Sequence, residues 1–248
     1  MTNPQSDDPP ADPSARRPAA ARLTVNGAAL EADVSGALHW PAGNTLVVSD
    51  LHLEKASSYA AQGHLLPPYD TSATLRGLET LVARHRPARV VSLGDSFHDP
   101  AAAERLDGAA AERIRALTRD RDWVWICGNH DPAPPEDWGG RVAAELALGP
   151  LVFRHEALAA GPCAGEVSGH YHPKASVRVR GRRLTARCFV TDGRRLILPA
   201  FGAFTGGLDV RNPAVARLFA EGFVAHLLGR DRVFAFPSTA LLEQPAFT

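Results

Sequence analysis

Short apolar runs alternate with helix-like segments between residues 44 and 131, and this alternation constrains the fold more than any other feature. The runs are NTLVVSD (44–50), ARVVSLGDS (88–96) and DWVWICGNHD (122–131). Each of them stops at polar residues, as a buried strand does. Segment 73–86 carries leucines at helical spacing, and segment 101–120 predicts a second helix that is broken near Gly108. The order strand, helix, strand, helix, strand predicts a parallel or mixed sheet covered by helices.

The pattern changes beyond Leu151, where short apolar segments follow one another with tight turns between them. These segments are LVFRHEA (151–157), GEVSGH (165–170) and the stretch 176–204, with turns at Arg180-Gly181 and Asp192-Gly193. They predict a second, more antiparallel sheet. An Asn26-Gly27 pair near the start predicts a hairpin. Residues 1–21 are rich in Pro, Ala, Asp and Ser and predict a disordered tail, so we expect one folded domain over residues 22–248.

The overall charge narrows the classes of partner. The chain of 248 residues has 27 basic and 27 acidic residues, hence a formal net charge of zero, which argues against an extended nucleic-acid footprint. A nucleic-acid contact would therefore have to be local, for example at RVRGRR (178–183). A solvated hairpin edge is the simpler interpretation of that run.

The spacing of the cysteines and the lengths of the apolar stretches indicate the cellular compartment. The three cysteines have no CxxC spacing, which argues against a disulfide framework and a cysteine-based zinc site and favours a reducing environment. The N-terminus has no apolar signal sequence, and no stretch approaches the roughly 18 consecutive apolar residues of a membrane span. We therefore expect a cytoplasmic protein without membrane contact, and the sequence leaves its oligomeric state open.

Five predicted strand ends are followed by residues that bind divalent cations through oxygen or nitrogen. In chain order these are Asp50 and His52; Asp95, His98 and Asp99; Asn129, His130 and Asp131; His155; and His170 and His172. Ligands in open α/β sheets lie beyond the carboxyl ends of the strands, so we expect these side chains to converge. Gly94, Gly128 and Gly169 precede three of the groups and permit the tight turn that lifts the next side chain out of the sheet.

Each of these groups has a simpler interpretation when it is taken alone. Gly-Asp is a common turn, and Gly-Asn-His-Asp is typical of an Asn/Asp-rich turn. A lone histidine such as His155 is more often an interior residue with its hydrogen bonds satisfied. The shared position of all five groups at the predicted sheet edge is what favours a metal site.

The order of the motifs carries a family resemblance. Asp-x-His, Gly-Asp, Gly-Asn-His-Asp, a lone His and Gly-His-x-His together resemble the calcineurin-like metallophosphoesterase superfamily, from about Leu46 to Pro173. More narrowly, SDLHLEKASSYA, LLPPYDT, LGDSFHD, GNHDP, GHYHPKA and LILPAFGAFTGGL resemble the bacterial DNA-ligase-associated metallophosphoesterases, which are DNA damage response endonucleases, and this similarity extends to about Gly229. The resemblance implies an α/β fold, a four-layer αββα sandwich of two mixed β-sheets flanked by helices.

The resemblance also implies a centre of two divalent metal ions. Carried over by motif, one metal takes Asp50, His52 and His172, the other takes Asn129, His155 and His170, and Asp95 bridges both. A shared carboxylate offsets the mutual repulsion of two cations about 3.5–4 Å apart, which can trap a hydroxide between them as the nucleophile. The family implies Mn²⁺, and the mixed nitrogen and oxygen ligands also suit Fe²⁺ or Zn²⁺.

Two further histidines are expected to be catalytic. By resemblance, His130 stabilises the transition state or protonates the leaving oxygen, although a histidine that only orients a metal ligand is the simpler alternative. His98 lies three residues after Asp95 in GDSFH, which resembles the recombination-repair nucleases of the superfamily rather than its protein phosphatases. Asp99 is a candidate partner for His130.

These features favour a dinuclear-metal-dependent phosphodiesterase, and more narrowly a Mn²⁺-dependent DNA endonuclease that acts on single-stranded or looped DNA in repair. The resemblance adds a functional link to a DNA ligase and a helicase. A small-molecule phosphodiesterase or nucleotide pyrophosphatase of the same superfamily is the alternative that the neutral charge favours. A non-catalytic adaptor is a third hypothesis, against which the complete set of ligand positions argues. The aromatic residues of FGAFTGG (201–207) either stack on a nucleic-acid base or pack in the core.

Overall fold

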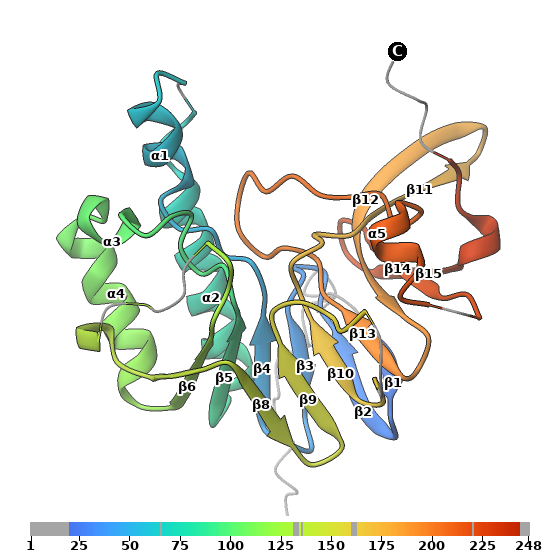
Figure 1. Cartoon of the computed structure of the whole chain (residues 1–248), viewed down its shortest axis with the longest axis horizontal. Helices are drawn as coiled ribbons and strands as arrows, with labels where there is room; N and C mark the ends of the chain where they lie inside the picture. Colours follow the sequence, from blue (N-terminus) through green and yellow to red (C-terminus); the bar gives the residue numbers. More distant parts are fainter. Residues whose placement is uncertain are drawn as a thin grey trace, which may run out of the picture.

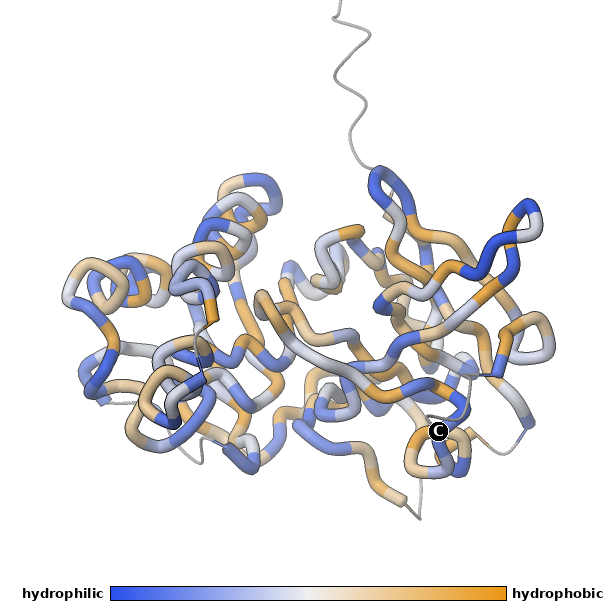
Figure 2. Tube along the Cα trace, turned by 90° about the horizontal axis from the view of Figure 1, so that it is seen from above, coloured by the Kyte–Doolittle hydropathy of each residue, from blue (hydrophilic) through white to orange (hydrophobic). Residues whose placement is uncertain are grey.

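The computed structural model describes residues 20–64, 66–130, 134, 136–159, 163–219 and 221–243. Two β-sheets form the middle of the molecule, and four helices lie together on one side of it, at the left of Figure 1. These helices are α1 (Lys55–Ala61), α2 (Asp70–His85), α3 (Ala102–Arg105) and α4 (Gly108–Arg119). Seen from above, hydrophilic and hydrophobic stretches alternate along the chain (Figure 2).

The first sheet holds seven strands in their sequence order. They are β1 (Ala21–Val25), β2 (Ala28–Ala32), β3 (Leu38–Trp40), β4 (Thr45–Val48), β5 (Arg89–Leu93), β6 (Asp122–Ile126) and β7 (Arg141–Ala143). The first four strands are antiparallel, whereas β4 to β7 run parallel. Parallel neighbours need a long crossover, and the helices between β4, β5 and β6 supply it. The predicted alternation of strands and helices is therefore confirmed.

Helix α1 was not predicted, α2 differs from the prediction at its start, and the predicted break near Gly108 is confirmed. α2 begins at Asp70, three residues before the predicted start, and the helix predicted over residues 101–120 is divided into α3 and α4 near Gly108. The Asp107 side chain accepts a hydrogen bond of 2.7 Å from the amide of Ala110 and so caps α4. This cap explains why α4 starts where it does although a glycine is its first residue.

The second sheet is mixed, in the order β15-β14-β12-β13-β10-β9-β8, with β11 paired to β12. Its strands are β8 (Glu145–Leu148), β9 (Leu151–Arg154), β10 (Glu166–Ser168), β11 (Lys174–Val179), β12 (Arg182–Thr191), β13 (Arg195–Ile197), β14 (Val224–Leu228) and β15 (Val233–Pro237). β9, β10 and β13 are parallel, and the other pairs are antiparallel. Short elements complete the chain: 3-10 turns η1 (Glu136–Trp138) and η2 (Ser238–Ala240), and helix α5 (Pro213–Ala216).

Alternating side chains of the strands build three buried clusters. In β4, Leu46 and Val48 pack with the leucines of α2, whereas Val47 packs with Phe153 of the second sheet. A third cluster covers the far side of the second sheet, where Val190 packs with residues of α5. Three clusters separate four layers, so the structure is the expected sandwich of two mixed sheets. The outermost layer on the second sheet is mostly irregular chain, because α5 spans four residues.

The structure gives the start of the first strand but does not test the predicted boundary of the folded domain. β1 begins at Ala21, and residues 1–19 lie outside the described part of the chain, so the disordered tail and the domain boundary at residue 22 stay predictions. None of the helices in the described part is long and apolar enough to cross a membrane.

Candidate active site

Five strands from both sheets deliver polar loops to one edge of the molecule. β4, β5, β6, β9 and β10 are followed by Asp50, Asp95, Asn129, His155 and His170, respectively. Hydrogen bonds tie the loops together: the amide of Asp50 donates to the Gly94 carbonyl at 3.3 Å, and the amide of Gly169 donates to the His155 carbonyl at 2.9 Å. The amide of His170, after β10, also donates to Oδ2 of Asp50, after β4, at 3.1 Å, so the loops of the two sheets hold one another in place along this edge.

A first cluster of candidate ligands consists of Asp50, His52 and His172, with one ligand atom of each within 4.8 Å of the others. The Nε2 atoms of the two histidines are 3.3 Å apart, and Nε2 of His172 is 3.3 Å from Oδ1 of Asp50. Asp50 is fully buried, and its Oδ2 accepts hydrogen bonds from Ser49 Oγ and from the amide of His170. These bonds turn Oδ1 toward the imidazole of His172.

A second cluster consists of Asp95, His155 and His170, with Asn129 beside it. Nδ1 of His155 is 2.8 Å from the Leu93 carbonyl, which can only accept, so Nδ1 carries the proton and Nε2 has a free electron pair. That Nε2 lies 2.7 Å from Oδ1 of Asn129 and 3.1 Å from Nδ1 of His170. The electron pair on this nitrogen and the amide oxygen repel each other at this distance. A cation bound to both atoms would remove that repulsion.

Asp95, a member of the second cluster, also reaches toward the first cluster. Its Oδ2 is 3.5 Å from Nε2 of His155 and 3.9 Å from Nε2 of His52, and its side chain is buried. Its Oδ1 accepts a hydrogen bond of 3.0 Å from the backbone amide of His130. One carboxylate therefore reaches an imidazole of each cluster, which is the position that a bridging ligand needs.

Five of the seven predicted ligands have a left-handed backbone. The φ angles are 51° at Asp50, 43° at His52, 45° at Asp95, 69° at His170 and 46° at His172. Such a conformation in a residue other than glycine costs on the order of 1 kcal/mol or more and persists only where the surroundings enforce it. Because this costly conformation recurs at five predicted ligands, we infer that the surrounding structure holds the backbone in the form that brings these side chains together.

Burial lowers the pKa of two of the candidate histidine ligands. Desolvation, together with the nearby His172 and His98, lowers the pKa of His52 to about 3. Burial and the neighbouring His155 lower the pKa of His170. Burial acts to raise the pKa of Asp50, but the hydrogen bond and charge of His172 leave it below its usual value. Neutral imidazoles and ionised carboxylates are the forms that bind divalent cations, so the two clusters fit a dinuclear metal site.

Gly169 leaves room for the Asp50 carboxylate. A Cβ atom at position 169 would lie 1.7 Å from Ser49 Oγ and 2.6 Å from Asp50 Oδ2. We expect Gly169→Ala to displace Asp50, to destabilise the fold by about 1–3 kcal/mol and to lower the metal content per chain. Thermal unfolding and elemental analysis measure both effects. Gly108→Ala is the matched control, because a Cβ there meets no atom within 4 Å; equal metal contents in the two variants would contradict the prediction.

His130 lies beside the clusters. Its ring Nδ1 donates to the carbonyl of His98 at 2.9 Å, which leaves Nε2 free, 4.0 Å from Oδ2 of Asp95. The ring stacks on that of His98 with centroids 5.6 Å apart, and its side chain is 45% exposed, so a substrate can reach it. His98 in turn approaches His52, with their Nδ1 atoms 3.4 Å apart.

The suggested pairing of Asp99 with His130 is not found among the described residues. The carboxylate of Asp99 instead pairs with Arg105 of α3, with Oδ2 2.6 Å from Nη2. The side chain therefore turns toward α3, and the backbone carbonyl of His98 holds the ring of His130 in its place.

A cavity of about 350 Å³ opens over these residues. Besides the histidines, it is lined by Lys55, the first residue of α1, and by Gly206, Gly207 and Leu208 of the loop after β13. Burial lowers the pKa of Lys55. Neither Lys55 nor this loop belongs to a ligand motif, and the only sequence signal for Lys55 is its position three residues after His52.

All seven predicted metal ligands and both predicted catalytic histidines are brought to one place. The ligands are Asp50, His52, Asp95, Asn129, His155, His170 and His172, and the catalytic candidates are His98 and His130. Asp131 of the Gly-Asn-His-Asp motif lies outside the described residues. The role of each individual residue stays a prediction, which the variants below test.

Solved structures resemble this chain. A crystal structure of the nuclease MPE from Pseudomonas putida matches with a TM-score of 0.68 and 32% identity, covering 88% of this chain and 100% of that chain. The phosphoesterase YfcE from E. coli matches with a TM-score of 0.40 and 18% identity, covering 77% of this chain and 97% of that chain, and this weaker likeness carries no argument. A scan against protein-family models and a search of curated proteins found no match.

Proposed function

Because this chain belongs to the calcineurin-like metallophosphoesterase superfamily, we propose that it is a Mn²⁺-dependent DNA endonuclease that acts on single-stranded or looped DNA. Membership follows from the 32% identity over the whole length of the P. putida nuclease MPE, and it makes the chain a hydrolase of phosphoester bonds. The nuclease activity of that neighbour supports a nucleic-acid substrate. We place the reaction in cytoplasmic DNA repair, with a functional link to a DNA ligase and a helicase.

The arrangement of the ligand side chains and His130 around one cavity carries this proposal. Two divalent cations bound there would supply a nucleophile at neutral pH and stabilise negative charge on the phosphate. The chain itself holds Asp50 and His155 in fixed orientations through hydrogen bonds to Ser49 and Leu93. His130 presents Nε2 toward the cavity, where it can hold a proton for the leaving oxygen. No serine or cysteine nucleophile is needed.

A basic stripe on the β11–β12 hairpin supports a polyanionic substrate. Directly opposed residues of antiparallel strands share a face, so the pairs Lys174–Arg187 and Arg178–Arg183 lie on the same face of the hairpin. None of these four residues has a carboxylate partner in the part of the chain that the structure describes. The stripe starts two residues after His172, and the hairpin extends away from the sheet (Figure 1). Because these four cationic side chains share one face and have no carboxylate partner, we favour contact with phosphates over the interpretation of a solvated hairpin edge.

A substrate panel tests the proposal. We expect the Mn²⁺-loaded protein to nick a labelled hairpin-loop DNA, seen by gel electrophoresis, with a higher kcat/KM than for cyclic nucleotides or nucleotide-sugar diphosphates. A preference for any of the small substrates would establish the small-molecule phosphodiesterase that the zero net charge favours. Protein that purifies without metal and binds none on titration would indicate the non-catalytic adaptor.

A further inference from the structure

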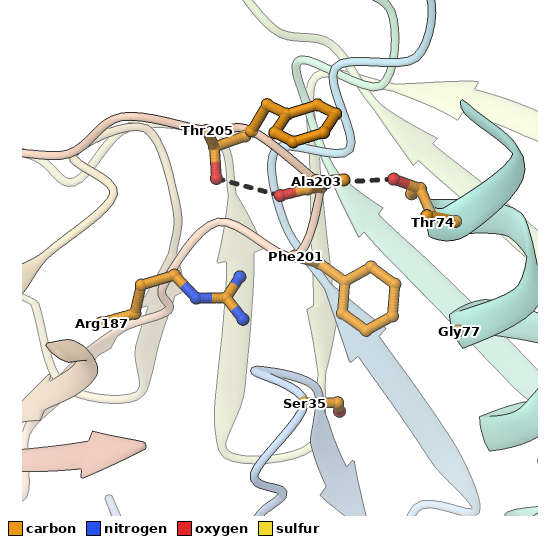
Figure 3. A pocket seen from close by; sticks show the side chains of 10 residues that line it. Ser35, Thr74, Gly77, Arg187, Phe201, Ala203 and Thr205 are labelled. Carbon is orange, nitrogen blue, oxygen red and sulfur yellow. Dashed lines mark hydrogen bonds between the residues drawn. The ribbon is translucent and has the colours of Figure 1, made fainter. Parts of the chain in front are cut away.

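A second cavity lies next to the metal clusters and has the chemistry of an anion site. It measures about 380 Å³ and lies between α2, the turn after β2, β12 and residues 201–205. Its polar side chains are one guanidinium, of Arg187, and three hydroxyls, of Ser35, Thr74 and Thr205 (Figure 3). No described residue that lines it carries a carboxylate. We call it the Arg187 pocket.

One loop separates the Arg187 pocket from the metal clusters. Residues 201–205 line the pocket, and the next three residues line the metal cavity. The amide of Phe201 donates to the Ser49 carbonyl at 2.8 Å, and the amide of Gly202 donates to the Asp50 carbonyl at 3.2 Å. A Cβ at Gly202 would lie 2.0 Å from the Leu51 carbonyl oxygen, so the two backbones touch. The pocket is therefore held at a fixed distance from the ligand Asp50.

Arg187 points into the pocket toward the ring of Phe201 (Figure 3). Its Nη1 donates to the Ala200 carbonyl at 2.6 Å, and no carboxylate pairs with it among the described residues. Burial lowers the pKa of Arg187, but a guanidinium stays charged in proteins. A partly buried cation without a counter-charge bears a desolvation cost that a bound anion offsets. The planar guanidinium, with donors left over, is suited to a phosphate group.

The two phenylalanines of FGAFTGG have different environments. Phe201 is 8% exposed and packs in the core under α2, where a Cβ at Gly77 would lie 3.0 Å from its ring. Phe204 is 51% exposed, and its backbone has a left-handed φ of 58°. An exposed aromatic ring on a strained backbone beside a cationic pocket is typical of a surface that stacks on nucleic-acid bases. The core interpretation therefore applies to Phe201, whereas the ring of Phe204 is open to contact with a base.

We propose that the Arg187 pocket is a nucleotide subsite, in which Arg187 binds a phosphate of the DNA strand whose scissile bond lies at the metal clusters and Phe204 stacks on an adjoining base. The subsite rests on the proposed nuclease function. Arg187 is also the inner end of the basic stripe that continues to Arg183 on the same face of the hairpin. The strand therefore runs from the metal clusters past the loop and onto the hairpin.

Binding of a single-stranded oligonucleotide tests the subsite directly. A fluorescently labelled, phosphorothioate-linked strand, which hydrolyses slowly, is titrated with Mn²⁺-loaded protein at several salt concentrations, and its anisotropy is recorded. Arg187→Met is expected to weaken binding about ten-fold and to reduce the slope of log affinity against log salt by about 0.7, the value for one phosphate contact on a single strand. Phe204→Ala is expected to weaken binding about ten-fold without changing that slope. Arg187→Lys keeps the charge and should retain the slope.

Arg119→Met is the matched control, because it removes an exposed arginine of α4 that pairs with Glu112 and lines neither cavity. It should bind the oligonucleotide as the wild type does. Equal affinity and slope for Arg187→Met and the wild type would overturn the subsite. The small ester bis-p-nitrophenyl phosphate reports on the metal clusters alone. If Arg187→Met lost the same activity on this ester as on DNA, the subsite would also be overturned, because Arg187 would then have a structural role in holding the loop.

The same measurements separate the subsite from the proposed function. In turnover assays, Arg187→Met is expected to raise KM for DNA and to lose more kcat/KM on DNA than on the small ester. If the wild type binds the oligonucleotide through Arg187 but hydrolyses only the small ester, the nuclease function fails and the subsite stands. If the wild type cleaves DNA and Arg187→Met leaves both KM and the salt slope unchanged, the subsite fails and the nuclease function stands.

Discussion

Replacing Asp95 by alanine is expected to abolish hydrolysis of both DNA and bis-p-nitrophenyl phosphate, with kcat/KM reduced at least about 10³-fold. Oδ2 of Asp95 approaches an imidazole Nε2 in each cluster, at 3.5 Å from His155 and 3.9 Å from His52, whereas Asp50 reaches His155 only on its protonated Nδ1. Without it, two neighbouring cations would repel each other with no negative charge between them. Elemental analysis should therefore show the loss of at least one metal per chain together with the loss of activity.

Two further variants sharpen this test. Asp95→Asn keeps an oxygen that can accept the hydrogen bond from the His130 amide but removes the charge, so it should lose metal although the loop is held. Asp137→Ala removes a 64% exposed carboxylate that pairs with Arg115 and should change neither metal content nor activity. An Asp95→Ala protein that still holds two metals per chain would refute the bridging assignment.

Replacing His130 by alanine is expected to lower kcat on DNA by about 10²–10⁴-fold, the usual contribution of a positioned general acid or base. Nε2 of His130 is free because Nδ1 donates to the His98 carbonyl, and the side chain is open to the cavity. An alkoxide leaving from DNA needs a proton near neutral pH, which a histidine at this position can supply. The metal content should stay at the wild-type value, because His130 lies outside both ligand clusters.

The leaving group distinguishes the possible roles of His130. If it protonates the leaving oxygen, His130→Ala should lose far less activity on bis-p-nitrophenyl phosphate, because p-nitrophenolate departs without a proton. Equal losses on both substrates would instead indicate that the imidazole stabilises charge in the transition state. Loss of metal from His130→Ala would support the simpler alternative of a histidine that orients a ligand. His39→Ala, at an imidazole that pairs with Glu31, is the control.

The strands that lead to the site could be predicted because their sequences carry a local signal. β4, β5 and β6 are covered on both faces, so they appear as short apolar runs that end at polar residues. Helix α1 had no such signal. Its first turn has no side-chain cap, and the amide of Ala56 is instead satisfied by Asp70 at 2.8 Å, fourteen residues away. A helix that starts through a tertiary contact cannot be recognised from its own residues.

The two phenylalanines of FGAFTGG show the same limit at the level of single side chains. Phe201 and Phe204 are three residues apart in one loop, and nothing in their local sequence separates a core residue from an exposed one. The structure separates them because the amide of Phe201 bonds to Ser49, which turns its ring under α2 against Gly77. The distinction depends on three segments that are far apart in the sequence.

The sequence alone determined which side chains stand at the strand ends, because strands and cation ligands both depend on residue types that are visible in short stretches. Only the tertiary structure decided which atoms face one another: Asp95 Oδ2 toward an imidazole of each cluster, and Arg187 in a pocket beside the ligands. The physical reason is that these relations arise from pairing and packing between the two sheets. Such contacts join residues that are far apart in the chain, for example 120 positions for His52 and His172, and no local pattern records them.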